Sequence, residues 1–288
     1  MSHPLSPAIR AVLEECVGGE RDDAVALCLS AGMDSLSCGL AAEAVGKRVA
    51  AYTFILRGKP EGTDAKLSRH HARVYGWPWQ RVDLPNAVDT LMLDVVFLVT
   101  GLGLRKKTEI ECVWPFLYLL PQIAESAVVA GTCADGYFGV SKKAMIHYRN
   151  LPTLDGFRRA LFTNPDYAQV RVLSRVASHC GKRMVLPYRA AKLLDVFAGT
   201  GWYDLNKPSQ KQPLRDLYPE MRRVKIGNHL NYQCGDSGIG VHFAKLLRTE
   251  LNAGKYRSVI GVYNSIARGQ VGRGMIEAAR ERWAWCLP

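Results

Sequence analysis

The chain has 288 residues, of which 48% are hydrophobic and 22% are charged, and its formal net charge is +12; this length can bury one large core or two smaller ones. It contains no apolar run of about 20 residues, and its first residues lack the basic-then-apolar pattern of a signal peptide, so we expect a soluble, cytoplasmic protein without a membrane segment. Its eight cysteines are scattered without a Cys-x-x-Cys pair, which argues against a structural zinc site and against a disulfide framework.

Apolar periodicity predicts a short helix over Pro7–Val17 and then a buried strand over Ala24–Leu29. The strand enters a tight turn at residues 30–35, after which the apolar spacing predicts another helix. Farther along, β-branched runs alternate with helical spacing. These runs predict strands at Val49–Ile55, Trp79–Leu84 and Ala127–Ala130, and helices at Thr63–Tyr75 (ended by Gly76), at Asn86–Leu98 (capped by Asn86) and at Glu109–Ser126 (broken by Pro115 and Pro121).

Repeated strands separated by helices predict right-handed βαβ units, and therefore an α/β fold with a parallel, Rossmann-like sheet and flanking helices. Ligands of such sheets bind at the carboxyl ends of the strands, where the turn at 30–35 lies. From Ser141 onward the strand signals fade, and the spacing predicts helices at Thr153–Phe162, Tyr167–Ser178, Ala190–Ala198, Val241–Leu251 and Gly274–Trp285. We therefore expect an α/β core over residues 1–140 and a mainly helical region over 141–288 that completes the active site.

The charge is divided unevenly between these two parts. Residues 1–140 carry 13 Lys/Arg and 16 Asp/Glu, whereas residues 141–288 carry 25 and 10. So basic a second half attracts polyanions, which makes nucleic acid a candidate partner. An equally open alternative is a soluble surface with a few phosphate-binding residues. Paired cations on helix ends and loops are the expected nucleic-acid contacts: Lys142, Lys143, Arg158, Arg159, Lys182, Arg183, Arg222, Arg223 and Lys225.

The turn Ser-Ala-Gly-Met-Asp-Ser at residues 30–35 carries the clearest chemical signal. A strand–turn–helix connection aims backbone N–H groups and the positive helix end at one point, where an anion binds well. Ser30 and Ser35 add hydroxyl donors, Gly32 allows close approach, and Asp34 can hold a divalent cation over bound phosphates. An ordinary strand–helix connection capped by a serine is the alternative interpretation.

This turn resembles the Ser-Gly-Gly-x-Asp-Ser signature of the PP-loop ATP pyrophosphatases, with Ala31 in place of the first glycine and Met33 at the variable position. Members of that family bind ATP, cut it between the α- and β-phosphates, and leave AMP on a carbonyl oxygen of the substrate. The resemblance implies an adenine nucleotide alpha hydrolase-like fold in which residues 29–35 bind ATP.

A second block, residues 131–139, resembles the Gly-rich loop of the asparagine synthetase branch of that family; Asp135, Phe138 and Gly139 match, while Thr132 and Gly136 stand where the family has glutamates. The resemblance implies that Asp135 faces Asp34 and that the two carboxylates bind Mg²⁺. It also implies that Thr132 lies at the site where the amine or ammonia is activated. The residues implied to lie beside the adenosine are Leu29, Thr53, Phe54, Ala130 and Gly131.

A third block, from Leu186 to Pro219, resembles the synthetase segment in which a Lys-x-x-Leu-Arg run follows a Leu-Pro-aromatic helix start. Lys211 stands four residues before Arg215, as the family's catalytic lysine stands before its arginine. The resemblance implies that Lys211 neutralises charge on the α-phosphate and on the tetrahedral intermediate, with Arg215 near the active site.

Together the three blocks imply an ATP- and Mg²⁺-dependent ligase or amidotransferase: it adenylates a small carbonyl or carboxylate substrate, releases pyrophosphate and transfers the acyl group to ammonia or an amine. We expect no N-terminal glutaminase domain, because neither Met1 nor Ser2 supplies the N-terminal cysteine that such a domain needs. A separate ammonia-supplying protein is therefore an expected partner.

Two other functions stay open. AMP could activate a nucleobase in tRNA or DNA, and thiolation of such a base would need two cysteines brought together from among Cys112, Cys133 and Cys234. Alternatively, the chain could be a catalytically silent nucleotide-binding protein, which the Thr132 replacement suggests.

Overall fold

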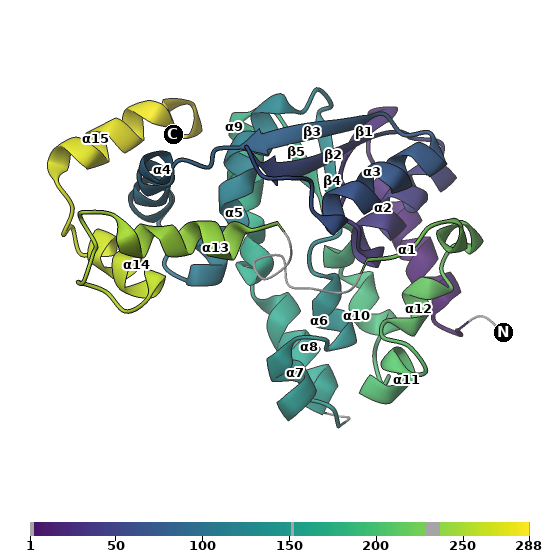
Figure 1. Cartoon of the computed structure of the whole chain (residues 1–288). Coiled ribbons are helices and arrows are strands. Elements are labelled where there is room, and N and C mark those ends of the chain that lie inside the picture. Colours follow the sequence, from purple (N-terminus) through teal and green to yellow (C-terminus); the bar gives the residue numbers. More distant parts are fainter. Residues whose placement is uncertain (1–2, 151–152, 228–236, 288) are drawn as a thin grey trace.

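The computed structural model describes residues 3–150, 153–227 and 237–287. Its centre is a sheet of five parallel strands in the order β3–β2–β1–β4–β5 (Figure 1). The strands are β1 (Ala24–Cys28), β2 (Arg48–Leu56), β3 (Trp79–Leu84), β4 (Ala127–Ala130) and β5 (Arg183–Val185). The protein is therefore an α/β protein with a Rossmann-like sheet, which confirms the sequence prediction at this level.

Helices make up most of the other described residues. They are α1 (Ser6–Gly18), α2 (Met33–Ala44), α3 (Thr63–Tyr75), α4 (Val88–Thr100), α5 (Lys107–Leu119), α6 (Ala134–Phe138), α7 (Lys142–His147), α8 (Thr153–Thr163), α9 (Val170–His179), α10 (Lys192–Val196), α11 (Trp202–Asn206), α12 (Gln212–Arg215), α13 (Ile239–Ala244), α14 (Val259–Ala267) and α15 (Arg273–Arg282). Short 3₁₀ segments lie at Leu120–Gln122, Tyr167–Gln169, Pro187–Arg189, Pro219–Arg223, Lys245–Arg248 and Ala284–Cys286.

Alternate residues of the strands face two separate cores. In β1, Val25 and Leu27 belong to the core that includes α1 and α2, whereas Ala26 belongs to the core that includes α4 and α5. Both faces of the sheet are covered by helices (Figure 1). Strands buried on both faces are continuous apolar runs, which is why the sequence predicts the short strands β1 and β4.

The element boundaries test the sequence predictions directly. The bounds predicted for α3, β3 and β4 are confirmed, and Gly76 ends α3 in the left-handed conformation. The prediction that Pro115 breaks a helix is wrong, because α5 runs through it. Trp114 and Leu117 on this helix are fully buried, and their burial outweighs the backbone hydrogen bond that a proline removes. The helix does end ahead of Pro121.

Two other predictions are corrected. Asn86 does not cap a helix: α4 starts at Val88, and the Asn86 side chain accepts a hydrogen bond from Lys245 Nζ at 2.9 Å. The helix predicted from Tyr167 begins as a 3₁₀ segment in which Ala168 has left-handed backbone angles, so α9 starts only at Val170. Sequence reasoning also missed β5, because its three residues are too few to show a period.

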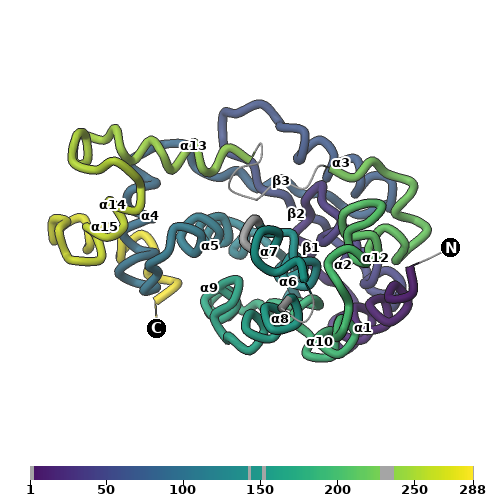
Figure 2. The backbone as a smooth tube through the Cα atoms, turned by 90° about the horizontal axis from the view of Figure 1, so that it is seen from below, coloured from purple at the N-terminus to yellow at the C-terminus, as the bar shows by residue number. Residues whose placement is uncertain are grey.

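The chain after α12 returns to α4 at one end of the molecule. Helices α14 and α15 contact α4, and Figure 2 shows these three helices together at the end opposite to α1, α2 and α12. None of the helices in the described residues combines the length and apolar character that crossing a membrane requires.

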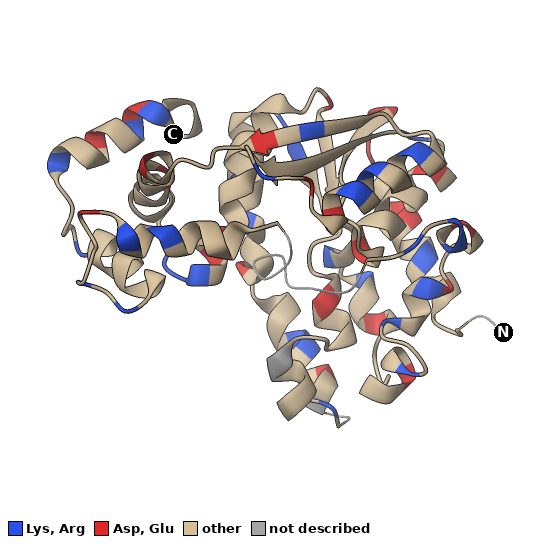
Figure 3. Cartoon of the chain, viewed as in Figure 1, with Lys and Arg blue, Asp and Glu red and all other residues tan. Residues whose placement is uncertain are grey.

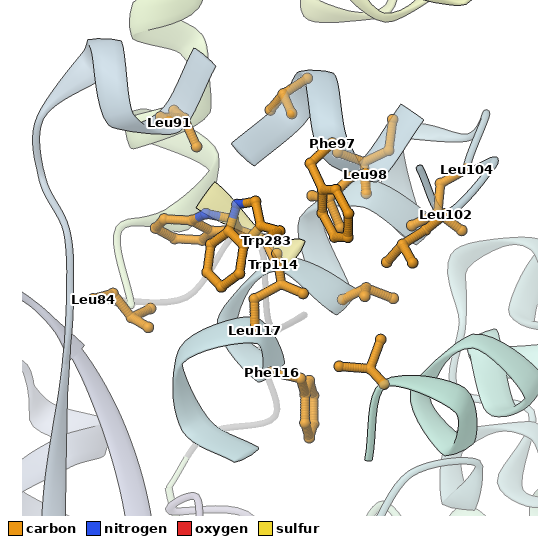
Figure 4. Close-up of a cluster of buried hydrophobic side chains, with 14 of the residues drawn as sticks. Leu84, Leu91, Phe97, Leu98, Leu102, Leu104, Trp114, Phe116, Leu117 and Trp283 are labelled. Carbon is orange, nitrogen blue, oxygen red and sulfur yellow. The ribbon is translucent and has the colours of Figure 1, made fainter. Parts of the chain in front are cut away.

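One buried carboxylate joins α15 to α4 and α5. Asp94 is fully buried; its Oδ1 accepts from Arg282 Nε (3.0 Å) and Trp283 Nε1 (2.9 Å), and its Oδ2 accepts from Trp114 Nε1 (2.8 Å) and the Tyr118 hydroxyl. Figure 4 shows the rings of Trp114 and Trp283 beside each other in this cluster. Burial raises the pKa of Asp94 above its usual value, although these donors favour the carboxylate.

Replacing this carboxylate leaves buried donors without an acceptor, so Asp94→Ala should lower the free energy of unfolding by about 3 kcal/mol. Asp89→Ala is the matched control, because Asp89 is an exposed residue of the same helix and its loss should cost less than about 1 kcal/mol. Urea denaturation of both variants checks this. Equal losses in the two would contradict the anchoring role of Asp94.

Candidate functional site

The site lies where the direction of the strand order reverses. From β1 the chain proceeds to β2 and β3 on one side, whereas β4 and β5 lie on the other side of β1. Cys28 at the end of β1 is paired with Ala130 at the end of β4, so residues 29–35 and 131–135 leave the sheet side by side. Crevices at this position of α/β sheets are the usual ligand sites.

The turn at residues 30–35 is held by its own serines. The Ser35 hydroxyl accepts from the Ser30 N–H at 3.0 Å and lies 2.9 Å from the Ser30 hydroxyl, which in turn accepts from the Gly32 N–H at 3.2 Å. Gly32 is the N-cap of α2 and makes no side-chain cap. The two hydroxyls, expected from the sequence as ligand donors, therefore also shape the turn that precedes the helix N-terminus.

Gly131 allows the second loop to approach this turn. A Cβ atom at residue 131 would lie 2.5 Å from the carbonyl carbon of Asp34 and 2.7 Å from the backbone nitrogen of Ser35. Both are backbone atoms that cannot rotate away. Only glycine therefore permits the separation seen between the end of β4 and the start of α2.

Lys211 links the two loops. Its Nζ donates to both carboxylate oxygens of Asp34, at 2.8 and 2.6 Å, and to Asp135 Oδ1 at 2.6 Å. Lys211 is 1% exposed, and its Nζ lies 5.9 Å from the centroid of the Phe138 ring. The structure thus brings together three predicted site residues that are up to 177 positions apart in the sequence.

The charge of Lys211 depends on these carboxylates. Burial lowers the pKa of a lysine, but the negative charges and hydrogen bonds of Asp34 and Asp135 outweigh this effect, so the pKa of Lys211 is raised above its usual value. Lys211 is therefore an ammonium ion at neutral pH, balanced by two carboxylates beside the N-terminus of α2.

The two carboxylates form a candidate cation site. Asp34 and Asp135 already converge on one positive group, and carboxylate oxygens are the ligands that Mg²⁺ takes together with phosphates and water. No cluster of three or more His, Cys, Asp or Glu side chains able to hold a metal ion is found in residues 3–150, 153–227 and 237–287.

A cavity of about 200 Å³ is lined by Asp34 and Lys211 but not by Asp135. Among its lining residues, Gln210, Ile226 and Gly227 were not predicted from the sequence. The Gly227 N–H donates to the Ala31 carbonyl at 2.9 Å. The sequence shows a glycine after the basic segment that ends at Lys225, but this pattern does not indicate a contact with Ala31. The lining residues are Gly32, Met33, Asp34, Gln210, Lys211, Arg215, Ile226 and Gly227.

Arg215 and Thr132, the other two predicted catalytic residues, have different surroundings. Arg215 is exposed, lines the cavity and donates from Nε to the Gln210 carbonyl at 3.3 Å. Thr132 is half-buried directly after Gly131 and does not line the cavity. The structure therefore brings Arg215, but not Thr132, to the cavity that Lys211 lines.

The residues expected beside the adenosine lie at the ends of β1 and β4 and in the second half of β2. Leu29 and Ala130 are buried, and Phe54 is half-buried. The Thr53 hydroxyl donates to the Leu29 carbonyl at 2.8 Å and accepts from Trp79 Nε1 at 3.1 Å. These contacts connect the residue after β1 to the interior of β2 and to the first residue of β3.

The prediction that Arg158 contacts nucleic acid is wrong. Arg158 is 1% exposed, and its guanidinium donates to Asp155 and to three backbone carbonyls, which removes it from the surface. Arg183 is exposed but paired with Glu20 and Asp22. The Lys142 and Lys143 side chains lie outside the described residues, and Lys182 is half-buried. The other exposed members of the set of expected contacts are Arg159, Arg222, Arg223 and Lys225.

The cysteines expected for a thiolation reaction are poor nucleophiles where they are described. Burial raises the pKa of both Cys112 and Cys133 to about 12, so each is a thiol at neutral pH. Cys234 lies outside the described residues.

No family model matches this chain, and no curated protein matches it.

Gly131→Ala should separate the two loops, because its methyl group would overlap the backbone of Asp34. We expect a loss of about 1–3 kcal/mol in unfolding free energy, measured by urea denaturation. Gly156→Ala is the control, since nothing lies within 4 Å of its Cβ position in α8, where alanine should be neutral or stabilising. Equal unfolding free energies in the Gly131→Ala and Gly156→Ala variants would refute the required close approach.

Proposed function

We propose that this protein is an ATP-dependent adenylating ligase of the asparagine synthetase-like, PP-loop type, with an adenine nucleotide alpha hydrolase-like core. The observation that carries the proposal is the ammonium of Lys211 between Asp34 and Asp135 at the strand-order reversal, beside a helix N-terminus. Such a site offers both donors and cation ligands to a polyphosphate.

In the proposed reaction, a carbonyl or carboxylate oxygen of the substrate attacks the α-phosphorus of ATP, and the bond from that phosphorus to the bridging oxygen breaks to release pyrophosphate. An amine or ammonia then attacks the acyl carbon, loses a proton and displaces AMP. Bound Mg²⁺ would neutralise charge on the phosphates, held by Asp34 and Asp135.

The chain's own residues have distinct roles in this scheme. The N-terminus of α2 would bind phosphate oxygens, with Gly32 allowing the approach. Lys211 would turn from the carboxylates toward the α-phosphate and the negative charge that develops there. Arg215, exposed at the cavity, would bind the departing pyrophosphate.

The products of ATP test this function. The protein should form AMP and pyrophosphate rather than ADP and phosphate, read by chromatography of α- and γ-labelled ATP over a panel of carboxylates, nucleobases, tRNA and DNA. Asp34→Asn and Asp135→Asn should each lower the rate by a hundredfold or more, on the order of 3 kcal/mol of transition-state stabilisation. ADP as the main product would refute the proposal.

Lys207→Ala is the control for Lys211→Ala, since Lys207 is exposed four residues away and does not line the cavity. Lys211→Ala should lower kcat by roughly 10²–10³ with little change in ATP affinity, and Lys207→Ala should leave both unchanged. Equal losses in both variants would show that the lysine is wrongly assigned.

Glutamine alone should support turnover only if a partner protein supplies ammonia.

A second candidate function is modification of a nucleobase. It is favoured by the basic segment Arg222–Lys225, whose charged side chains are exposed immediately before Ile226 and Gly227 of the cavity. Figure 3 shows further Lys and Arg residues on the helices of the second half. A polyanionic substrate held there would have its end close to Lys211.

Nucleic-acid binding tests this alternative. Six phosphate contacts would give a log–log salt slope near −5 on duplex DNA and a shallower one on single strands, measured by fluorescence anisotropy with tRNA and duplex DNA. Reversal of Arg222, Arg223 and Lys225 to Glu should weaken binding. Reversal of the exposed Lys255, Arg268 and Arg280 makes the same charge change far along the chain from the cavity residues, and should weaken binding less. Absence of binding at low salt would leave a small carboxylate as the substrate.

A further inference from the structure

Three consecutive carbonyls at the end of α6 are each bound by a side chain from another part of the fold. This helix has five residues and carries Asp135 in its first turn, so its last carbonyls have no partners within the helix. The donors are Arg158 Nε to the Tyr137 carbonyl (2.9 Å), Asn206 Nδ2 to the Phe138 carbonyl (2.9 Å) and Trp202 Nε1 to the Gly139 carbonyl (3.0 Å).

Only one of these donors also contacts Lys211. Asn206 is 5% exposed, and its Oδ1 accepts from the Lys211 N–H at 3.1 Å while its Nδ2 donates to the carbonyls of Phe138 and Trp202, both at 2.9 Å. The amide thus uses its acceptor for Lys211 and its donors for α6 and α11. A carboxylate or an aliphatic side chain of the same size cannot do both.

The Lys211 backbone needs such a contact. Lys211 has φ 55° and ψ 43°, a left-handed conformation that non-glycine residues rarely adopt. A residue keeps such a conformation only where contacts with its surroundings stabilise it. Strained residues of this kind are common at functional sites. The bond from the Lys211 N–H to a buried amide oxygen is one contact that fixes it.

These contacts form a closed circuit: from the Lys211 backbone to Asn206, from Asn206 to the end of α6, along α6 to Asp135, and from Asp135 back to Lys211 Nζ. We propose, on the basis of the function proposed above, that Asn206 is a positioning residue that sets the distance between the Lys211 ammonium and the Asp135 carboxylate. It acts without touching the substrate, by holding the backbone from which the Lys211 side chain reaches the phosphates.

The wild-type protein already offers one test. Because the Lys211 N–H donates to a buried oxygen, its amide hydrogen should exchange with deuterium at least a hundredfold more slowly than an exposed loop amide. This measurement requires no variant, so it decides the question even if substitutions at residue 206 prevent folding. Exchange at the rate of an open loop would overturn the proposal.

The variants are Asn206→Leu, which keeps the number and branching of the side-chain heavy atoms but loses the hydrogen bonds, and Asn206→Ala. The matched control is Trp202→Phe, which removes the neighbouring donor to α6 from the same helix α11 and makes no contact with Lys211. Lys211 should be acylated by acetic anhydride at least tenfold faster in the Asn206 variants, read by mass spectrometry, and at the wild-type rate in Trp202→Phe. Equal labelling in all proteins would overturn the proposal.

Turnover provides the second measurement. In the Asn206 variants, kcat for AMP formation should fall 10- to 100-fold, and the KM for ATP should change less than about threefold. Trp202→Phe should keep the wild-type kcat and KM, even if its thermal midpoint falls as far as that of the Asn206 variants. A parallel loss of kcat in Trp202→Phe would reduce Asn206 to a structural role. If wild-type protein forms no AMP, the proposed function fails, while exchange and labelling still decide whether Asn206 positions Lys211.

Discussion

The two ion pairs that the buried Lys211 forms with the half-buried Asp34 and Asp135 are the interactions on which the candidate site depends. Removing an ammonium from water costs several kcal/mol unless partners of opposite charge replace its hydration. Two carboxylates within 2.8 Å supply that replacement here, and they raise the pKa of Lys211 despite its burial. This arrangement is therefore stable only when three segments come together: the start of α2, the start of α6 and the residue before α12.

The sheet makes this meeting possible. Because β1 and β4 are parallel neighbours, the loops that leave them start side by side, and Gly131 lets the backbones approach to a separation that a Cβ atom would prevent. The helices on the two faces bury alternate residues of the strands, so the site is held between two packed cores. Rigid strands beneath polar loops are a common basis for ligand sites.

The second half of the chain contributes in two different places. Residues near 206–227 close over the first loop, through Lys211 and through the contact of Gly227 with Ala31. Helices α14 and α15 instead pack on α4, where Asp94 binds Arg282 and Trp283. The high positive charge of this half is accordingly divided: Arg158 serves the interior, whereas Arg222 and Arg223 remain exposed near the cavity.

The sequence by itself determined the features that depend on local pattern: the buried strands, the helix Thr63–Tyr75 with its terminal glycine, and the α/β class. Local turn chemistry also singled out Asp34, whereas Asp135 and Lys211 were singled out by the resemblance of their segments to family motifs. Only the tertiary structure decided what depends on partners distant in the sequence. A proline inside α5 is outweighed by burial, a three-residue strand exists only because β4 pairs with it, and the amide of Asn206 gains its role from two backbones that the sequence does not place together.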